Sequence, residues 1–559
     1  MCGIVGVISK KGENVVPLVK KMLESMSTRG PDGYGLEVDE KIIKSDSIDQ
    51  LYSELYTGKC VLGHARLAIV GGLRGSQPFR SCNGRFTLEH NGEIYNYKEL
   101  RKNLKENHVF TSKTDSEVIV HLLEENLAKS GNMISAIRKT VADLDGVYAI
   151  VIKDEMTNEL FLIRDKIGVR QLYYGQDDHV FGFASEKKAL WKIGLSEDIQ
   201  RVMPATAVCF SNNRKVKTFQ IMEIPSDIFV SEEEMKYKTM EDAVKAYKVA
   251  LINAMKKRTQ DLERIGIIFS GGIDSVIIAL LAKQMSKEVI CYTGGIRGSN
   301  DIKYAKQISE ILGFELKVNE LDTQEVEDML PDIITTIEET NVGQVEVAIP
   351  VYAAVKLAKS DGIRVMFSGQ AADELFGGYS WYSKIVKTEG YESLQRYMLE
   401  DLSLLYKETL EREDKITMAH SIEMREPFLD KDVIETAMNT SIKLKVFDGN
   451  DSLGKRVHRL LAVELGIPKD VAYRIKEAAQ HGSGLHETLD SIARKKGFHQ
   501  MVIPTLVKAE LQKREKLGSS QRYGYMFDDH DKWNNKLYVQ VFLDNLCNKI
   551  PQLAPLFVD

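Results

Sequence analysis

Short apolar runs bounded by Gly, Asn or Asp dominate the first 220 residues, a pattern typical of β-strands. These runs lie at Ile4–Ser9, Val61–Val70, Phe86–His90, Gly146–Lys153, Glu159–Arg164, Val180–Ala184 and Thr206–Phe210. Two other stretches, Val15–Ser27 and Asp115–Leu127, repeat apolar residues every three or four positions, which predicts helices. Strands with inserted helices predict a layered α+β domain over residues 1–220.

A more polar stretch, residues 221–240, follows this domain. It contains the acidic run Ser231–Glu234, which is typical of a solvated linker or of a helix start. From residue 241 strands alternate with helices. The predicted helices are Thr239–Thr259, Val276–Met285 and Asp301–Leu312, and the predicted strands are Arg264–Phe269, Glu288–Thr293, Glu315–Val318 and Ile363–Phe367. This alternation predicts an α/β domain with a parallel sheet over residues 241–559, and the chain beyond about residue 390 indicates a helical C-terminal part.

Composition narrows the class of protein. Hydrophobic residues make up 43% of the 559 positions and charged residues 28%, close to ordinary globular proteins, which excludes a disordered or fibrous chain. The net charge is −6, whereas proteins that bind nucleic acids usually have an excess of basic residues. No apolar run approaches the roughly 18 residues that span a bilayer. The six cysteines are scattered without a Cys-x-x-Cys pair, which favours a reducing cytoplasm over a zinc ribbon or a disulfide framework. We therefore expect a cytoplasmic enzyme; a homodimer is compatible with the sequence, which does not decide the oligomeric state.

A glycine-rich string follows the first strand of the second domain. It reads Ser270-Gly271-Gly272-Ile273-Asp274-Ser275, and a helix starts within it. Adjacent glycines let the backbone approach a ligand, and a helix N-terminus offers N–H groups to an anion. Asp274 could hold a divalent cation that bridges phosphate oxygens. An ordinary strand-to-helix turn is the alternative, but the complete string favours phosphate binding.

A second glycine-containing string has the spacing of a Walker A loop. It runs from Gly449 to Arg456, but Arg456 stands where that loop needs the magnesium-binding Ser or Thr. We interpret it as a polar turn that caps a helix over Lys455–Leu465.

Further strings make the second domain similar to a known family. Ser270–Ser275 resembles the pyrophosphate loop of ATP pyrophosphatases, which split ATP into AMP and pyrophosphate. The other strings are Ser368–Tyr379, Arg412-x-Asp414, Ser421–Asp430, Arg474–Glu477 and Gly482–Gly484. Together they resemble the synthetase domain of glutamine-hydrolysing asparagine synthetases.

The resemblance implies ATP as a substrate and Mg²⁺ as a cofactor, with Asp274 and Asp373 as the metal ligands. The residues it implies for ATP and pyrophosphate are Phe269, Ser270, Gly271, Gly272, Asp274, Ser275, Thr293, Ser368, Gly369, Lys384 and Lys476. For the two lysines, a solvated side chain is the alternative.

Three positions depart from the family pattern: Gln370 replaces the usual Glu, Ala371 the usual Gly, and Gln171 the usual Pro of an Arg-Pro-Leu-Tyr string. Gln370 is a candidate catalytic residue, but an amide cannot act as a base near neutral pH. We therefore expect Gln370 to orient by hydrogen bonding, while a phosphate oxygen or a carboxylate such as Glu374 accepts the proton from the attacking ammonia.

The first domain carries a candidate nucleophile at its start. Removal of Met1 would leave Cys2 with a thiol and an α-amine that can serve as its base. By position alone Cys2 would be an incidental buried cysteine. The strings Met1–Gly6, Arg29–Asp32, His64–Val70, His90–Asn96 and Thr114–Glu117, however, resemble class II glutamine amidotransferases. This resemblance implies an N-terminal-nucleophile hydrolase fold.

The same resemblance implies the roles around Cys2. Cys2 would attack the glutamine side chain, and Asn91 with Gly92 would form the oxyanion hole. Arg66 would bind the α-carboxylate, and Glu93 with Asp115 the α-ammonium. The complete implied glutamine site is Arg66, Leu67, Ala68, Ile69, Val70, Asn91, Gly92, Glu93 and Asp115. The alternative for Asp115 is an N-cap of a helix over Ser116–Leu127. His64 and His90 are expected to be packing or backbone-bonding residues.

The expected activity is ATP-dependent amidation of L-aspartate through β-aspartyl-AMP, with ammonia taken from L-glutamine. Glutamine, aspartate and ATP would be its small-molecule partners, without nucleic acid or membrane. Two alternatives stay open: a related ligase that acts on another carboxylate, and a glutaminase or glutamine-sensing protein whose second domain is degenerate. Cys2 argues for the use of glutamine nitrogen, and the retained Asp274 and Asp373 argue against the second alternative.

Overall fold

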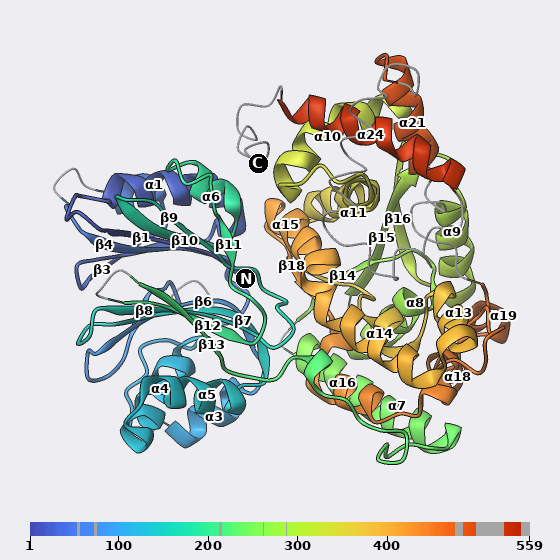
Figure 1. The fold of residues 1–559 in the computed structure, drawn as a ribbon, viewed down its shortest axis with the longest axis horizontal. Coiled ribbons are helices and arrows are strands. Elements are labelled where there is room, and N and C mark those ends of the chain that lie inside the picture. Colours follow the sequence, from blue (N-terminus) through green and yellow to red (C-terminus); the bar gives the residue numbers. More distant parts are fainter. Residues whose placement is uncertain are drawn as a thin grey trace. The chain divides into compact units, whose positions relative to one another are not determined.

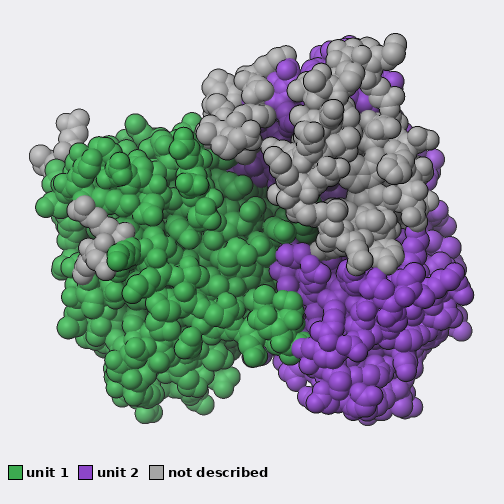
Figure 2. All heavy atoms as spheres, viewed as in Figure 1, with its two compact units in different colours: residues 1–228, 405–423, 558–559 green, residues 229–404, 424–557 purple. Residues whose placement is uncertain are grey.

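The computed structural model describes the whole chain except residues 53–55, 72–74, 105, 212–214, 261, 287, 476–483, 499–529 and 549–559 (Figure 1). The chain divides into two compact units (Figure 2). The first comprises Met1–Ile228 and Leu405–Glu423, and the second comprises Phe229–Leu404 and the described chain from Met424 onward. The stretch Leu405–Glu423 therefore belongs to the first unit, although the sequence pattern placed it within residues 241–559.

Two antiparallel sheets form the centre of the first unit. The seven-stranded sheet has the order β11-β9-β10-β1-β4-β2-β3, and the six-stranded sheet β13-β12-β8-β7-β6-β5. Their strands are β1 (Cys2–Ser9), β2 (Tyr34–Val38), β3 (Lys41–Ser45), β4 (Cys60–Arg66), β5 (Phe79–Arg80), β6 (Phe86–Ile94), β7 (Gly146–Asp154), β8 (Glu159–Arg164), β9 (Tyr173–Gln176), β10 (Val180–Ala184), β11 (Gln200–Arg201), β12 (Thr206–Phe210) and β13 (Val216–Gln220).

The alternation of side chains along β1 shows how the layers form. Ile4 packs into a core shared by the two sheets, whereas Val5 and Val7 face the opposite side and pack against helix α1. A third core lies between the six-stranded sheet and helices α3, α4 and α5, so this unit has four layers, helix–sheet–sheet–helix (Figure 1). The described helices are α1 (Val16–Ser25), α2 (Ile48–Leu51), α3 (Tyr97–Leu104), α4 (Glu117–Ser130), α5 (Met133–Asp143), α6 (Lys187–Trp191) and α15 (Glu411–Ala419).

The second unit is built on one five-stranded sheet with the order β16-β15-β14-β17-β18. Strand β14 pairs in parallel with β15 and β17, and β15 pairs in parallel with β16. The strands are β14 (Arg264–Ile268), β15 (Glu288–Ile296), β16 (Glu315–Leu321), β17 (Val365–Phe367) and β18 (Glu423–Arg425). The helices are α7 (Met240–Thr259), α8 (Ile273–Met285), α9 (Asn300–Leu312), α10 (Thr323–Ile337), α11 (Val342–Ser360), α12 (Ala372–Phe376), α13 (Ser380–Glu389), α14 (Tyr391–Leu405), α16 (Lys431–Met438), α17 (Ile442–Lys445), α18 (Arg456–Glu464), α19 (Lys469–Ala472), α21 (Leu485–Lys495) and α24 (His530–Asn548).

The predicted fold class is confirmed: layered antiparallel sheets with helices come first, and a parallel-sheet unit with a helical C-terminal part follows. The predicted strand Val61–Val70 is too long, because β4 ends at Arg66 and the next residues leave the sheet. The hairpin of β2 and β3 was not predicted. Among the described residues, no helix is both long and apolar enough to cross a bilayer.

Candidate active sites

Main-chain contacts on both sides fix the position of Cys2 at the start of β1. Cys2 lies opposite Arg66 in the β1–β4 pairing. Its N–H donates to Asn91 Oδ1 at 2.9 Å, and its carbonyl oxygen accepts from Arg29 Nε at 3.1 Å. The side chain is buried, and this burial raises the pKa of the thiol. A nucleophilic role for Cys2 therefore requires a base close to the sulfur.

A small cavity of about 20 Å³ lies beside Cys2. Arg66 lines it at the end of β4; Arg66 Nη2 donates to the Val70 carbonyl at 3.0 Å, and the buried Nη1 has no hydrogen-bond partner among the described residues. An unused guanidinium N–H at a cavity wall suits a carboxylate ligand. Of the predicted glutamine-site residues, the cavity is lined by Arg66, Leu67, Ile69, Val70, Gly92, Glu93 and Asp115. Ala68 and Asn91 are absent from its wall. The Ala68 N–H donates to Asp32 Oδ2 at 2.8 Å, which anchors the loop after β4.

Asn91 and Gly92 are adjacent on β6. The Asn91 side-chain nitrogen is buried without a hydrogen-bond partner among the described residues. A Cβ atom on Gly92 would lie 2.0 Å from the Val147 carbonyl oxygen, so only glycine fits there. An unsatisfied buried donor costs about 1–3 kcal/mol, and such a donor next to a nucleophile is what stabilisation of an oxyanion requires.

The acidic side of the cavity comes from Glu93 and Asp115. Asp115 accepts the Ile94 N–H at 2.9 Å, and burial raises the pKa of its carboxyl group. Helix α4 begins at Glu117 with Ser116 as its N-cap and without a side-chain capping bond. The cap alternative for Asp115 is therefore wrong.

The two histidines of the first-unit strings, His64 and His90, are both buried. His90 Nδ1 shares a hydrogen bond of 2.9 Å with the Ser116 hydroxyl. Burial lowers the pKa of each imidazole, that of His90 to about 3, so both rings are neutral at physiological pH.

The stretch Leu405–Glu423 contributes buried acids to the first unit. The Met1 ammonium group lies 3.1 Å from Glu423 Oε2, and both groups are fully buried. Arg29 Nη1 lies 2.7 Å from Glu186 Oε1 and 2.8 Å from Asp414 Oδ2. Asp414 and Glu423 thus lie beside the N-terminal site of the first unit. The sequence strings that contain these two residues resembled parts of a synthetase domain.

In the second unit, strand register brings the predicted phosphate-binding segments to one edge of the sheet. Ile268 on β14 pairs with Tyr292 on β15, and Ile267 pairs with Phe367 on β17. Phe269 and Ser368 therefore directly follow β14 and β17, and Thr293, inside β15, lies at nearly the same level. The loop then turns at Gly271, whose φ is +71°, and α8 starts after Gly272, with Asp274 and Ser275 in its first turn. The carboxyl edge of a parallel sheet with a helix N-terminus is where such folds bind ligands.

Two predicted metal ligands meet at one lysine at this edge. Lys455 Nζ lies 2.6 Å from Asp274 Oδ1 and 2.8 Å from Asp373 Oδ1. His458 Nε2 is 3.0 Å from Asp274 Oδ1, and His458 Nδ1 shares a hydrogen bond of 2.8 Å with the Tyr247 hydroxyl. Two carboxylates that converge on one cation form a donor set that fits a hard divalent ion such as Mg²⁺.

The other predicted residues of the second site differ in their surroundings. The Ser368 hydroxyl is buried without a hydrogen-bond partner among the described residues, and a Cβ on Gly369 would lie 2.8 Å from Asp274 Cβ. Gln370 is half-buried, and Lys384 lies on the exposed side of α13. Lys476 lies outside the described residues.

Comparison with known proteins decides the family. Residues 49–239 match the model of a glutamine amidotransferase domain, and residues 246–391 and 384–541 match that of asparagine synthase, which covers more than half of the chain. The chain belongs to the asparagine synthase family.

Curated relatives of this family resemble the chain over most of its length. A putative glutamine-hydrolysing asparagine synthetase 1 of Methanocaldococcus jannaschii is 34% identical in an alignment that covers 89% of this chain and 96% of that protein. Asparagine synthetase 1 of Arabidopsis thaliana is 30% identical over 87% of this chain and 78% of its own. A probable asparagine synthetase of Schizosaccharomyces pombe is 28% identical over 87% and 85%, respectively.

Lys455 was not predicted from the sequence as a residue of the second site. The Walker-like string does form a polar turn before α18, as interpreted, but Lys455 adopts a positive φ of 52° and its ammonium reaches the two acids. The available signal was the lysine itself, because a buried turn before a helix rarely holds a lysine without an acidic partner.

Glu374 is a second group with unusual surroundings. It lies on α12 and accepts the Tyr379 hydroxyl at 2.5 Å. Burial and the neighbouring Asp373 raise the pKa of Glu374 to about 7. A carboxyl group with this pKa can exchange a proton near neutral pH.

Proposed function

We propose that this chain is a glutamine-hydrolysing asparagine synthetase, which amidates L-aspartate at the expense of ATP. The observation that carries the proposal is the convergence of Asp274 and Asp373 beside the Ser-Gly-Gly loop at the carboxyl edge of the parallel sheet. The Cys2 cavity of the first unit supports glutamine as the nitrogen source. The names of the relatives point to the same reaction.

In the first half of the reaction, Cys2 is the nucleophile. Once Met1 is removed, the α-amine of Cys2 accepts the thiol proton, and the sulfur attacks the glutamine side-chain carbonyl. The Asn91 side-chain N–H and the Gly92 N–H stabilise the oxyanion. The α-ammonium group of Cys2 returns the proton to the leaving nitrogen, so collapse of this intermediate releases ammonia and leaves a thioester, which water hydrolyses to glutamate. Arg66 binds the substrate carboxylate, and Glu93 with Asp115 binds its ammonium group.

In the second half, the aspartate β-carboxylate attacks the α-phosphorus of ATP, pyrophosphate leaves, and β-aspartyl-AMP forms. Bound Mg²⁺, held by Asp274 and Asp373, would neutralise charge on the phosphate chain. The loop from Ser270 to Ser275 donates N–H and hydroxyl groups to phosphate oxygens, with further contacts from Phe269, Thr293, Ser368, Gly369, Lys384 and Lys476. Lys455 adds a positive charge where the leaving group gains negative charge.

Ammonia then attacks the activated carbonyl, AMP leaves, and the ammonium-like intermediate must lose a proton. Glu374 is the candidate acceptor, because its pKa of about 7 matches this task. Gln370 can only donate or accept a hydrogen bond and therefore orients the substrate. Exclusion of water at this stage protects the adenylate from hydrolysis.

The decisive experiment measures AMP, pyrophosphate and asparagine with ATP, Mg²⁺ and aspartate, given either glutamine or ammonium. Cys2→Ala should lose glutamine-dependent synthesis and keep ammonium-dependent synthesis, whereas Cys60→Ala, the same change in β4, should keep both. Asp274→Asn and Asp373→Asn should stop AMP formation, and Asp328→Asn on the exposed side of α10 should not.

A panel of carboxylates in place of aspartate tests the acceptor. If another carboxylate gives AMP faster than aspartate, the chain is a related ligase. If no carboxylate gives AMP while glutamine is still hydrolysed, the second unit is degenerate and the proposal is wrong.

We also propose a cytoplasmic location, in line with six cysteines that are scattered along the sequence without a Cys-x-x-Cys pair. A homodimer stays a prediction, which light scattering of the purified protein tests.

A further inference from the structure

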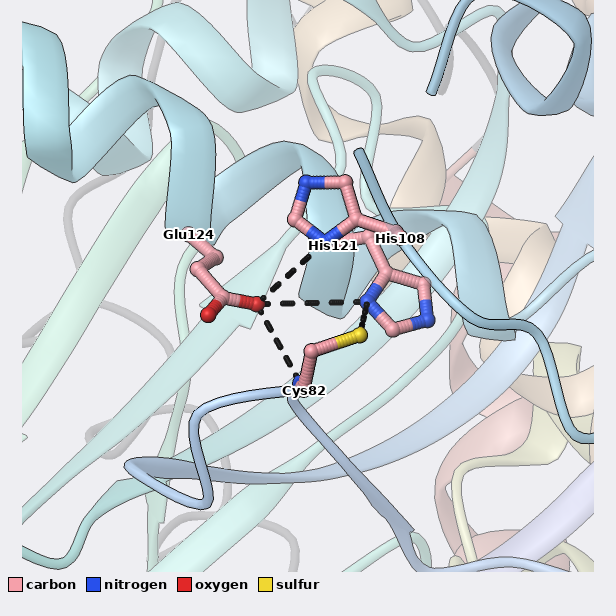
Figure 3. Close-up of side chains that lie close together, drawn as sticks. All are labelled: Cys82, His108, His121 and Glu124. Atoms are coloured by element: carbon pink, nitrogen blue, oxygen red, sulfur yellow. Dashed lines mark hydrogen bonds and ion pairs between the residues drawn. The ribbon is translucent and has the colours of Figure 1, made fainter. Parts of the chain in front are cut away.

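Four potential metal ligands converge in the first unit, away from the Cys2 cavity (Figure 3). Cys82 lies in the turn between β5 and β6, His108 in the segment after α3, and His121 and Glu124 one turn apart on α4. One ligand atom from each residue lies within 4.8 Å of the other three. Cys82 Sγ is 3.6 Å from His121 Nδ1, and His108 Nδ1 is 3.5 Å from Glu124 Oε2.

The histidines of this cluster are buried without adequate partners. The side chain of His108 is 6% exposed and that of His121 is 1% exposed. Both ring nitrogens of His108, and Nε2 of His121, make no hydrogen bond among the described residues; each faces only a carboxylate oxygen at a long distance of 3.5–3.8 Å. Buried polar atoms are normally hydrogen-bonded, and each one left unsatisfied costs about 1–3 kcal/mol. Two such imidazoles that meet a thiol and a carboxylate point to a missing ligand rather than to ordinary packing.

We propose that Cys82, His108, His121 and Glu124 form a zinc site. Sulfur, imidazole nitrogen and carboxylate oxygen are the donors that Zn²⁺ takes, in tetrahedral geometry with bonds of about 2.0–2.3 Å. Ligand atoms around such an ion lie roughly 3.3–3.8 Å apart, so the observed cluster needs to contract by about 1 Å at its widest pair. On binding, the Cys82 thiol releases its proton to solvent and the thiolate coordinates the metal. No oxidation or reduction is involved.

Neighbouring groups hold three of the ligands in place. Glu124 accepts the backbone N–H groups of Cys82 and Asn83, each at 3.2 Å, which ties the turn to α4. The Val109 N–H donates to Cys82 Sγ at 3.4 Å, as backbone amides do toward thiolates in metal sites. His121 Nε2 lies 3.8 Å from Glu117 Oε1, so its Nδ1 remains for the metal. These contacts orient the ligands in the way that outer partners do in known sites.

Protein side chains fill all four coordination positions of this zinc site. The site is therefore structural, because a catalytic zinc keeps one position open for water or substrate. The position of this site in the fold indicates what a bound zinc would do. Two ligands, His108 and His121, bracket the segment that carries Asp115, an acidic residue of the Cys2 cavity. A bound zinc would fix both ends of this segment and hold Asp115 at the cavity. The inference does not depend on the proposed reaction.

The test uses the full-length protein freed of metal by a chelator and then titrated with Zn²⁺ or Co²⁺. The wild type should bind one equivalent of Zn²⁺, and its Co²⁺ form should show tetrahedral d–d bands with a sulfur-to-cobalt charge-transfer band. Cys82→Ala should weaken zinc binding at least about 10-fold, and His179→Ala, at an exposed histidine outside the cluster, should not. Cys82→Asp should retain metal but lose the charge-transfer band.

Cys82 is exposed, so its replacement leaves the fold intact, which circular dichroism verifies. Zinc should also raise the melting temperature of the wild type and not that of Cys82→Ala. The proposal is overturned if the wild type binds no zinc under these conditions, or if Cys82→Ala binds it with unchanged affinity and an unchanged cobalt spectrum.

Discussion

Replacing Lys455 by Met removes the positive charge between Asp274 and Asp373 while keeping an unbranched side chain that is one atom shorter. Lys455 is 2% exposed, and its two acidic partners are 15% and 13% exposed, so solvent screens these ion pairs little. Removal of one partner from a buried ion pair costs about 3–5 kcal/mol. For a unit of this size each kcal/mol shifts the melting temperature by roughly 2 °C, so we expect a decrease on the order of 6–10 °C.

The assay is differential scanning calorimetry of the ligand-free protein, with and without Mg²⁺. Because the variant leaves two carboxylates facing a space without a cation, Mg²⁺ should stabilise Lys455→Met more than it stabilises the wild type. Lys245→Met, at an exposed lysine of α7, is the matched control and should change the melting temperature by no more than about 1 °C. If Lys455→Met melts with the wild type, or if Mg²⁺ stabilises both equally, the acids do not form a cation site.

Three other predictions concern the string after β17. The pKa of Glu374 is raised to about 7 from an ordinary value of about 4.3, so its stabilising contribution is complete below pH 4 and is lost as the pH rises through 7; Glu374→Gln should flatten the stability of the second unit between pH 5 and 8 in denaturant titrations. Ala371 has a φ of +77°, a conformation that costs a non-glycine residue about 1–2 kcal/mol. In the same titrations, Ala371→Gly should therefore be nearly neutral. The control Ala282→Gly, inside α8, should lower the free energy of unfolding by about 1 kcal/mol or more. Gln370→Glu should remain active and Gln370→Ala should lower asparagine formation several-fold; an inactive wild type that gains activity only as Gln370→Glu would show that the second unit has lost its native chemistry.

Regular elements could be predicted because their patterns are local. The β14–α8 turn follows from a buried strand, two glycines and a helix start, all within about a dozen residues, and the structure has it as predicted. The same holds for α7, where Thr239 caps the helix by accepting the Asp242 N–H. Parallel pairing then brings the ends of β14, β15 and β17 to one edge of the sheet, where the predicted phosphate-binding residues lie.

Contacts between distant segments could not be predicted in this way. Lys455 lies 181 residues from Asp274, and Glu423 lies 422 residues from the Met1 amine that it binds. The stretch Leu405–Glu423 carries a family string, but nothing in its own residues shows that Asp414 pairs with Arg29. The sequence showed that Ala371 replaces the usual glycine of the family string. Only the structure shows why glycine is usual there, because the φ of this residue is positive.

The buried position of Met1 sets an order of events in synthesis. The Met1 amine is fully buried against Glu423, and β1 is an inner strand flanked by β4 and β10. An aminopeptidase needs an extended, accessible terminus, so it must remove Met1 before these neighbours enclose it. At about 5–20 residues per second, β10 leaves the ribosome roughly 10–40 s after synthesis begins. On the proposed mechanism, which needs the α-amine of Cys2 as the base, Met1 would have to be removed within this interval, and a chain that folded first would lack that base.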